Sequence, residues 1–253
     1  MQMQEHLVAM CDVLGFSRMV QVLPLETLAQ QYVDLLDTLY TARWKHVDDV
    51  VRTYQTMSEV TVHPNEFPRV AVFSDTVIIW MAIAPDMKPE TALASTEQFF
   101  GAVALLIARG ISHRMPVRAG VALGRCVIDP EREVYVGLPI VQAYRTEQAQ
   151  EWVGGACHPS CLQYPPVERL FAGWHWPRWP PLVRYPVPVK RSTRPLDTPV
   201  AAINWPDSLL HIEDALTEQR DAASRPKDRR RWTNAIRFYR FQVANRPLGF
   251  GNT

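Results

Sequence analysis

Two apolar stretches decide the fold of this chain, His6–Ser17 (HLVAMCDVLGFS) and Arg69–Trp80 (RVAVFSDTVIIW), and each contains one aspartate. Aspartate is depleted in β-strands, so Asp12 and Asp75 are unusual within runs that otherwise look like buried strands. Burying an unpaired carboxylate costs several kcal/mol even after the protein relaxes. Each aspartate therefore has a partner of its own, or the two share one. A divalent cation held between adjacent strands would satisfy both, and this predicts a metal-dependent enzyme.

Hydrophobic periodicity around these stretches predicts a mixed α and β chain. Apolar residues recur at helical spacing over 25–55, and Pro89 begins a second helix that ends near Gly110. The remaining predicted elements are strands at 6–12, 69–73, 76–82, 117–123, 126–128 and 133–136, and a third helix over 137–150. The order β-α-β-β-α-β-β-α indicates an α+β, ferredoxin-like sandwich with a mixed sheet and its helices on one face.

The C-terminal part of the chain has a different composition. Ten of the 21 prolines lie between Pro159 and Pro199, together with three tryptophans, so we expect an irregular but ordered segment. After it we predict a strand over 200–204 and helices over 207–222 and 227–243. The chain is therefore divided into a core over 1–158 and a segment over 159–253 that packs on the core.

Composition narrows the classes of protein to consider. The formal net charge of +1 gives no general attraction for nucleic acid or for an anionic membrane. Uncharged apolar runs stay shorter than the roughly 18 residues that a membrane span needs, so no span is expected. The four cysteines lack the spacing of a disulfide framework, and the N-terminus lacks the features of a signal peptide. These observations predict a cytoplasmic protein with reduced thiols.

Four motifs in order resemble the class III nucleotidyl cyclases. They are Asp12-Val-Leu-Gly15-Phe16, Ser74-Asp75, Arg118-Ala-Gly120-Val-Ala-Leu-Gly124, and Gly137 followed by Arg145. The resemblance covers residues 6–160 and is greatest to the stand-alone pyrimidine cyclases of Pycsar antiphage defence. It implies a class III cyclase domain that converts UTP or CTP into 3′,5′-cyclic UMP or CMP and pyrophosphate. It also implies that the product activates a separate effector.

The same resemblance implies roles for individual residues. Asp12 and Asp75 would hold two Mn²⁺ or Mg²⁺ ions per site. The backbone that would cradle the triphosphate belongs to Val13, Leu14, Gly15 and Phe16. Arg145 takes the position of an arginine that such cyclases place on the phosphates from the opposite subunit, and Arg118 is a second catalytic candidate. The resemblance therefore implies a homodimer with composite active sites.

The chain departs from the purine-using members of this family in its expected base pocket. Ala71 and Val134 stand where those relatives read the base with a lysine and an aspartate. Neither side chain can hydrogen-bond a purine edge, which favours a pyrimidine substrate but does not choose between uracil and cytosine. Of the two bases, we favour uracil. Tyr54 is a further candidate for base contact. Val141 stands where the family has a ribose-orienting asparagine, so the ribose must be oriented by another group.

Other interpretations stay open beside this one. One is a purine cyclase with unusual base contacts, and another is a non-catalytic ferredoxin-like module that binds RNA or a partner protein. Cys157 and Cys161 have a spacing that zinc sites use, but no second pair follows, so packed thiols are favoured. The basic run over 225–231 is read as a solvated helix entry, because the net charge is near zero, and direct nucleic-acid binding is not expected.

Overall fold

The structure is a computed structural model that describes residues 3–37, 39, 68–172, 180–206 and 212–245. Its sheet is built around β1 (Gln4–Val13), which runs antiparallel to β3 (Thr76–Ile83) and to β4 (Val117–Asp129). β2 (Arg69–Phe73) pairs with β3, and β5 (Val134–Gly137) pairs with β4. β4 is one continuous strand, whereas the sequence predicted two strands interrupted at Gly124.

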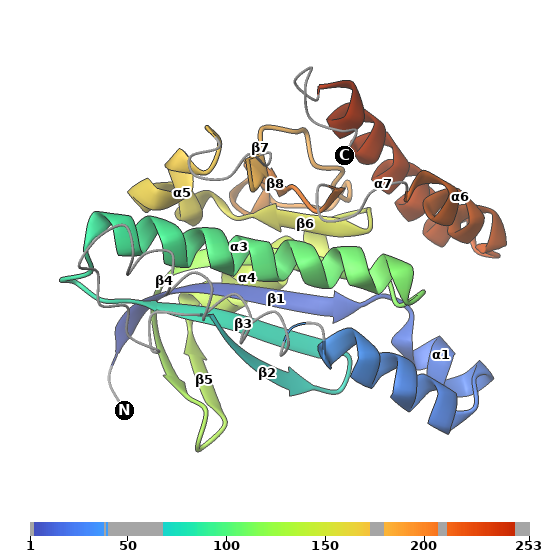
Figure 1. The fold of residues 1–253 in the computed structure, drawn as a ribbon, viewed down its shortest axis with the longest axis horizontal. Helices are drawn as coiled ribbons and strands as arrows, with labels where there is room; N and C mark the ends of the chain where they lie inside the picture. The colour runs from blue at the N-terminus through green and yellow to red at the C-terminus, as the bar shows by residue number, and fades with distance from the viewer. Residues whose placement is uncertain (1–2, 38, 40–67, 173–179, 207–211, 246–253) are drawn as a thin grey trace, which may run out of the picture.

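The second half of the sheet comes from the C-terminal part of the chain. β6 (Gly154–Cys157) runs parallel to β4, β8 (Ala201–Ile203) pairs with β6, and β7 (Leu182–Val183) pairs with β8. The resulting order is β2-β3-β1-β4-β6-β8-β7 (Figure 1). The strand predicted over 200–204 is confirmed as β8. Residues beyond 159 therefore complete the sheet that the N-terminal part begins.

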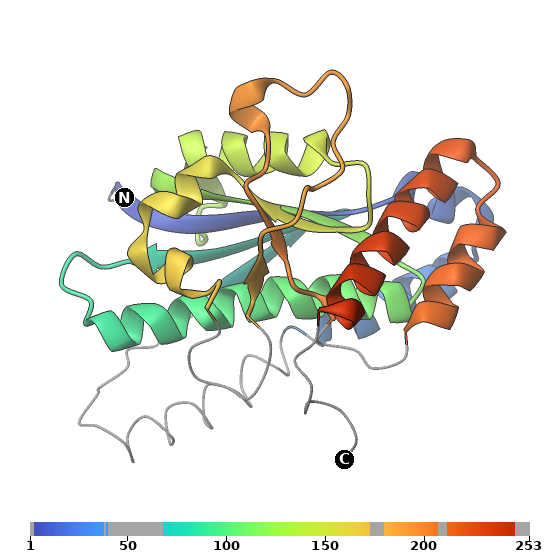
Figure 2. The same cartoon turned by 90° about the horizontal axis from the view of Figure 1, so that it is seen from above.

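Helices cover both faces of this sheet. α3 (Pro89–Ser112) lies on one face and α4 (Leu138–Ala149) on the other (Figure 2). A Cβ atom added at Gly155 would meet Ile107 of α3, whereas one added at Gly120 would meet the backbone of α4 at Ala143. The predicted α+β class with a mixed sheet is confirmed, but the prediction that the helices lie on one face is wrong. Gly120 is the physical reason, because the missing side chain lets α4 approach β4 closely.

The main hydrophobic core lies between the sheet and α3. Phe99, Leu106 and Ile107 of α3 are fully buried against apolar side chains of β1, β3 and β4. The helix predicted from Pro89 to near Gly110 is thereby confirmed. By length and composition α3 could cross a membrane, but 67% of its most apolar window is buried inside the fold, as in the core helix of a globular domain.

Smaller helices close the ends of the sheet. α1 (Phe16–Val22) follows β1 directly. Residues 25–37 and 39 are helical, and the other residues of the helix predicted over 25–55 lie outside the described residues. Near the Pro-rich region the short helices are η2 (Pro159–Gln163), α5 (Pro165–Arg169) and η3 (Pro195–Asp197). The C-terminal pair is α6 (Glu213–Ala222) and α7 (Pro226–Ala244), which lies at the same end of the molecule as α1 (Figures 1 and 2). Both predicted C-terminal helices are thus present. α6 begins at Glu213, and the first part of its predicted range, 207–211, lies outside the described residues.

Candidate active site

The structure brings the two predicted metal ligands together at one end of the sheet. Asp12 lies near the end of β1, where it pairs with Thr76 of β3 on one side and with Arg118 of β4 on the other. Asp75 occupies the tight turn between β2 and β3, directly before Thr76. The backbone N–H of Val13 donates to the carbonyl oxygen of Asp75 at 3.0 Å, which fixes this turn beside β1. The two aspartates are therefore neighbours in space, 63 positions apart in the sequence.

The electrostatics of Asp12 are those of a carboxylate that lacks full compensation. Burial raises the pKa of Asp12 above its ordinary value, and the neighbouring Asp75 carboxylate raises it further. The guanidinium groups of Arg118 and Arg231 act in the opposite direction without cancelling the effect. A cation between the two carboxylates would remove both the desolvation cost and the mutual repulsion.

The two carboxylates of this site suit Mg²⁺ or Mn²⁺. They would not suit a metal that needs all of its ligands from the protein. In the part of the chain that the structure describes, His, Cys, Asp and Glu form no cluster of three or more suited to a metal. Two carboxylates are nevertheless enough for Mg²⁺, which commonly takes one or two carboxylates and completes its octahedron with water and substrate phosphates. Asp12 and Asp75 would therefore hold such an ion together with a phosphorylated ligand.

The predicted phosphate cradle is only partly open. The N–H groups of Val13 and Leu14 donate to the carbonyl oxygens of Asp75 and Pro116, at 3.0 and 2.8 Å. Within the described residues this leaves the N–H groups at Gly15 and Phe16 to meet a phosphate. Gly15 adopts a left-handed conformation with φ of 82°, and nothing lies within 4 Å of where its Cβ would be. The glycine thus serves the turn between β1 and α1 and leaves space above it.

Arg118, the second predicted catalytic residue, is held in a buried network. Its side chain is 3% exposed, and its Nε donates to the Glu147 carboxylate of α4. Its Nη1 donates to the backbone carbonyl of Gln150 at 3.0 Å. Burial raises the pKa of Glu147 to about 7, and the charge and hydrogen bond of Arg118 oppose this shift only in part. Arg118 therefore links β4 to α4 and places its positive charge beside Asp12.

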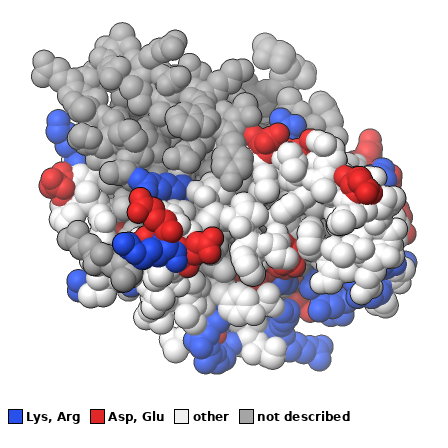
Figure 3. Space-filling view, turned by 90° about the horizontal axis from the view of Figure 1, so that it is seen from below, with Lys and Arg blue, Asp and Glu red and all other residues white. Residues whose placement is uncertain are grey.

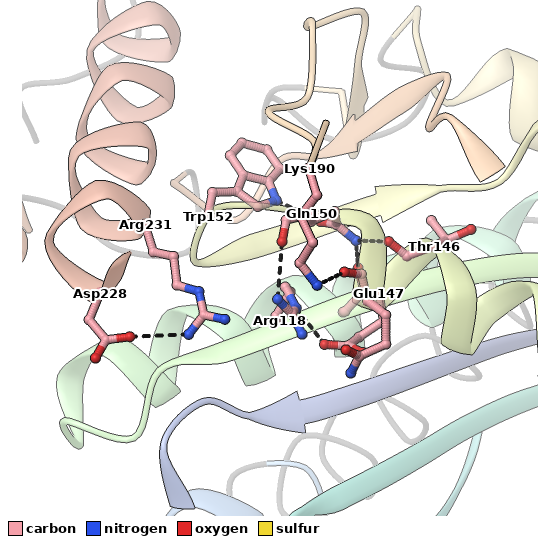
Figure 4. A network of polar contacts seen from close by, with 10 residues as sticks. Arg118, Thr146, Glu147, Gln150, Trp152, Lys190, Asp228 and Arg231 are labelled. Atoms are coloured by element: carbon pink, nitrogen blue, oxygen red, sulfur yellow. Dashed lines mark hydrogen bonds and ion pairs between the residues drawn. The ribbon is translucent and has the colours of Figure 1, made fainter. Parts of the chain in front are cut away.

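This network extends beyond the ion pair and was not predicted from the sequence. Gln150 donates through its amide to the carbonyls of Ala119 and Thr146, at 2.9 and 2.8 Å, and accepts from Trp152 Nε1 at 2.6 Å (Figure 4). Glu147 lies one helical turn after Ala143, on the side of α4 that faces Gly120. That spacing is visible in the sequence, but only knowledge that α4 packs on this face of the sheet makes it meaningful.

Arg145, predicted to act on the phosphates from a second subunit, lies on the outer side of α4. Its side chain is exposed, whereas Glu147 two residues later is buried against Arg118. Leu138, Val141 and Tyr144 share this outer surface and are 63%, 43% and 52% exposed. Val141, which replaces the expected asparagine, is therefore part of an apolar stripe next to Arg145.

The predicted base-pocket residues lie at different distances from Asp12 within one chain, and Ala71 pairs with Ile78, two positions along β3 from the Thr76 that pairs with Asp12. Val134 begins β5 opposite Asp129, eleven positions along β4 from the Arg118 that pairs with Asp12. This separation is about 35 Å at the usual rise of a strand. Ala71 lies on β2 beside a small second cluster formed around Val8 and Trp80. Tyr54 lies outside the described residues.

The cysteine pair is buried in the core, and arginines of the basic run form ion pairs within the chain. Cys157 and Cys161 are fully buried, and the Cys161 thiol contacts the Val121 carbonyl at 3.4 Å. In the basic run, Arg225 and Arg231 both pair with Asp228, at 2.8 and 3.3 Å. On the face of the molecule seen in Figure 3, the described Lys and Arg side chains stand in separate groups with Asp and Glu among them.

Comparison with known proteins supports the fold. No protein-family model and no curated protein matches the chain. The crystal structure of the adenylyl cyclase CyaB from P. aeruginosa matches 80% of this chain and 94% of its own, with 14% identity and a TM-score of 0.50. A bacterial light-regulated adenylyl cyclase matches 86% and 99%, with 13% identity and a TM-score of 0.43. The match to CyaB confirms the predicted class III cyclase fold.

Proposed function

We propose that this chain is a metal-dependent nucleotide cyclase. The observation that carries the proposal is the convergence of Asp12 and Asp75 beside the turn at Gly15, in a fold shared with a known adenylyl cyclase. A carboxylate pair with a raised pKa at Asp12 and an open backbone turn beside it suits a ligand that brings both a cation and phosphates.

The proposed reaction converts a nucleoside triphosphate into its 3′,5′-cyclic monophosphate and pyrophosphate. Asp12 and Asp75 would hold Mg²⁺ or Mn²⁺, which supplies charge to the phosphate oxygens and acidifies a hydroxyl when bound. The N–H groups of Gly15 and Phe16 would donate to phosphate oxygens. Arg118 would act indirectly, as a buried positive charge that favours the ionised form of Asp12.

The base of the substrate is the finer part of the proposal. Ala71 and Val134 offer no hydrogen-bonding side chain at the two positions where purine cyclases of this family read the base. This supports UTP, or alternatively CTP, and the resemblance extends to a product that activates an effector in antiphage defence. ATP is the second candidate, because CyaB, which shares the fold, is an adenylyl cyclase.

A second copy of the chain would complete the site. Arg145 is exposed on α4 beside the stripe of Leu138, Val141 and Tyr144, and no described contact uses this arginine within its own chain. Burying such a stripe against another copy would remove apolar surface from water. It would also carry Arg145 to the phosphates bound at the partner's metal site, where a guanidinium accelerates phosphoryl transfer by about 10³-fold or more.

The substrate is tested by incubating the purified protein with each of the four ribonucleoside triphosphates and Mn²⁺. Products are then resolved by mass spectrometry, with the Asp75→Asn variant as a control for contaminating activity. We expect cyclic UMP as the main product. Product from ATP or GTP alone would reject the pyrimidine assignment and keep the cyclase, while no cyclic nucleotide from any triphosphate would reject the cyclase.

The composite site is tested by mixing two inactive variants, Asp12→Ala and Arg145→Ala. Each mixed dimer would contain one intact site, so activity should return as subunits exchange. Exchange is measured separately with two fluorescent labels on the variants. Confirmed exchange without recovered activity would show that Arg145 does not act across the interface.

A further inference from the structure

A cavity adjoins the proposed metal site on the side of the C-terminal helices. It has a volume of about 590 Å³, within the usual range for small-ligand sites. Leu14 and Gly15, from the turn after β1, form one wall, and residues of α6 and α7 form the opposite wall. The cavity therefore begins where the proposed phosphate cradle ends. It connects the cradle to a part of the chain that the four sequence motifs do not include.

The lining of this cavity is positively charged. It contains four arginines, Arg18, Arg114, Arg225 and Arg231, against two carboxylates, Glu218 and Asp228. Arg114 pairs with Glu218 at 2.6 Å in an exposed bridge, and Arg18 donates to the hydroxyl of Ser224 at 3.0 Å. A single carboxylate, that of Asp228, serves both Arg225 and Arg231. The excess of positive charge favours an anionic occupant.

Arg231 differs from the other arginines of the lining in having a buried donor without a partner among the described residues. Its side chain is 14% exposed, and its Nε is buried without a hydrogen-bond partner among the described residues. Among the described residues it makes one ion pair, to Asp228, which is long at 3.3 Å. Figure 4 shows the side chain extending from α7 toward the sheet, on the same side as Arg118. A buried guanidinium with an unpaired donor costs free energy unless an anion completes it.

The surroundings of Arg231 join the cavity to the metal site. Burial and the like charge of Arg118 lower the pKa of Arg231, whereas Asp228, Glu147 and Asp12 raise it. Arg231 is thus within electrostatic reach of Asp12, although the two residues are 219 positions apart. The neighbouring Trp232 is buried in the core, and Asn234 donates to the Glu151 carbonyl at 2.8 Å, which fixes this part of α7.

We propose that the cavity between α1 and the α6–α7 pair is a polyphosphate-binding site, and that Arg231 is its principal donor. In terms of the proposed function, on which this assignment to substrate rests, the site receives the β- and γ-phosphates of the nucleotide and then the pyrophosphate product. The C-terminal helices thereby supply a binding residue from the same chain that carries Asp12. Arg145 would act on the same phosphates from the other copy.

Inorganic tripolyphosphate tests the site without requiring turnover. Its affinity is measured by isothermal titration calorimetry for the full chain, without nucleotide. Loss of charge-assisted hydrogen bonds from Arg231 should weaken binding about 10- to 100-fold in Arg231→Met, which keeps the apolar stem of the side chain. Arg231→Lys should retain part of the affinity. Arg240→Met is the matched control, because Arg240 lies on the same helix and pairs with Glu213 outside the cavity.

Asp228→Asn separates a binding role of Arg231 from a structural one. If Arg231 binds polyphosphate, this change removes a competing carboxylate, and the affinity for tripolyphosphate should rise several-fold. If Arg231 only anchors α7 through Asp228, the affinity should instead fall together with thermal stability. Unchanged or weaker binding in Asp228→Asn, or unchanged binding in a folded Arg231→Met, would overturn the proposal.

Two results would separate the polyphosphate site from the cyclase proposal. Tripolyphosphate binding that depends on Arg231, in a protein that cyclises no nucleotide, would support the site and reject the cyclase. Cyclase activity with the same KM and the same tripolyphosphate affinity in Arg231→Met would support the cyclase and reject the site.

Discussion

Asp12 and Arg118 face each other on neighbouring strands, yet the protein compensates their charges very differently. The Arg118 guanidinium is fully buried and donates to Glu147 and to the Gln150 carbonyl. Asp12 has no cation bonded to it within the described residues, and burial and Asp75 both raise its pKa. A charge that is satisfied in this way maintains the fold, whereas a charge left uncompensated is available to a ligand. Substitutions at these two adjacent positions should therefore have different effects.

The largest expected effect is a loss of turnover when Asp12 or Asp75 is replaced. Asp12→Asn and Asp75→Asn should each lower the cyclisation rate by about 10³-fold or more, because either change removes charge that holds the cations. The melting temperature should stay the same or rise, because a carboxylate whose pKa is raised in the folded state destabilises that state when ionised.

Asp86→Asn provides the matched control for these two variants. Asp86 is exposed in the loop between β3 and α3, whereas Asp75 lies in the turn at the opposite end of β3. It should change neither the rate nor the melting temperature. A large loss of stability in Asp12→Asn would show that Asp12 belongs to the architecture and would remove the contrast with Arg118.

Replacing Arg118, whose charge is paired with Glu147, should instead lower the stability of the fold. Arg118→Met should lower the free energy of unfolding by about 3–5 kcal/mol, because it leaves the buried Glu147 carboxylate without its partner. Urea denaturation followed by circular dichroism measures this loss. Replacing both residues, as Arg118→Met with Glu147→Met, should recover most of it, since buried apolar pairs often substitute for buried ion pairs. An additive double variant would contradict the pairing.

A pH titration of stability sharpens the same comparison. The pKa of Glu147 is raised from 4.5 to about 7 in the folded state, so the folded protein binds more protons than the unfolded chain between these values. The contribution of Glu147 to the free energy of unfolding should therefore fall as the pH rises through this window, by about 3 kcal/mol in total. Glu147→Gln should remove this part of the slope. An identical slope in the variant would show that Glu147 titrates normally.

Features that depend on neighbouring residues could be predicted from the sequence, whereas features that depend on tertiary packing could not. The resemblance to class III cyclases implied that Asp12 and Asp75 meet, although 63 positions separate them. The strand-like runs around them and the turn before Thr76 were predictable because such patterns are local. The helix from Pro89 was predictable for the same reason. The electrostatic interaction of Arg231 with Asp12 was not predictable, because it depends on how Trp232 packs α7 against the core.

The position of α4 is a second feature that sequence periodicity could not determine. An amphipathic pattern shows that a helix has a buried side, but it does not show which face of the sheet that side covers. The relevant signal in the sequence is Gly120, which was predicted only as part of a motif. In the structure it is a contact point, and Glu147 reaches Arg118 because α4 comes close there.

Gly120→Ala is accordingly the smallest change that separates the two roles. The added Cβ would lie 2.2 Å from the Ala143 carbonyl oxygen and 2.3 Å from the Glu147 nitrogen, both in the backbone of α4. Such overpacking costs about 1–3 kcal/mol and would shift Glu147 away from Arg118. Gly101→Ala is the matched control, since nothing lies within 4 Å of its Cβ position in α3. Alanine there should stabilise the helix by about 1 kcal/mol, so the two identical substitutions should change the free energy of unfolding in opposite directions. Equal effects at both positions would mean that α4 does not pack on β4 as closely as its contact with Arg118 requires.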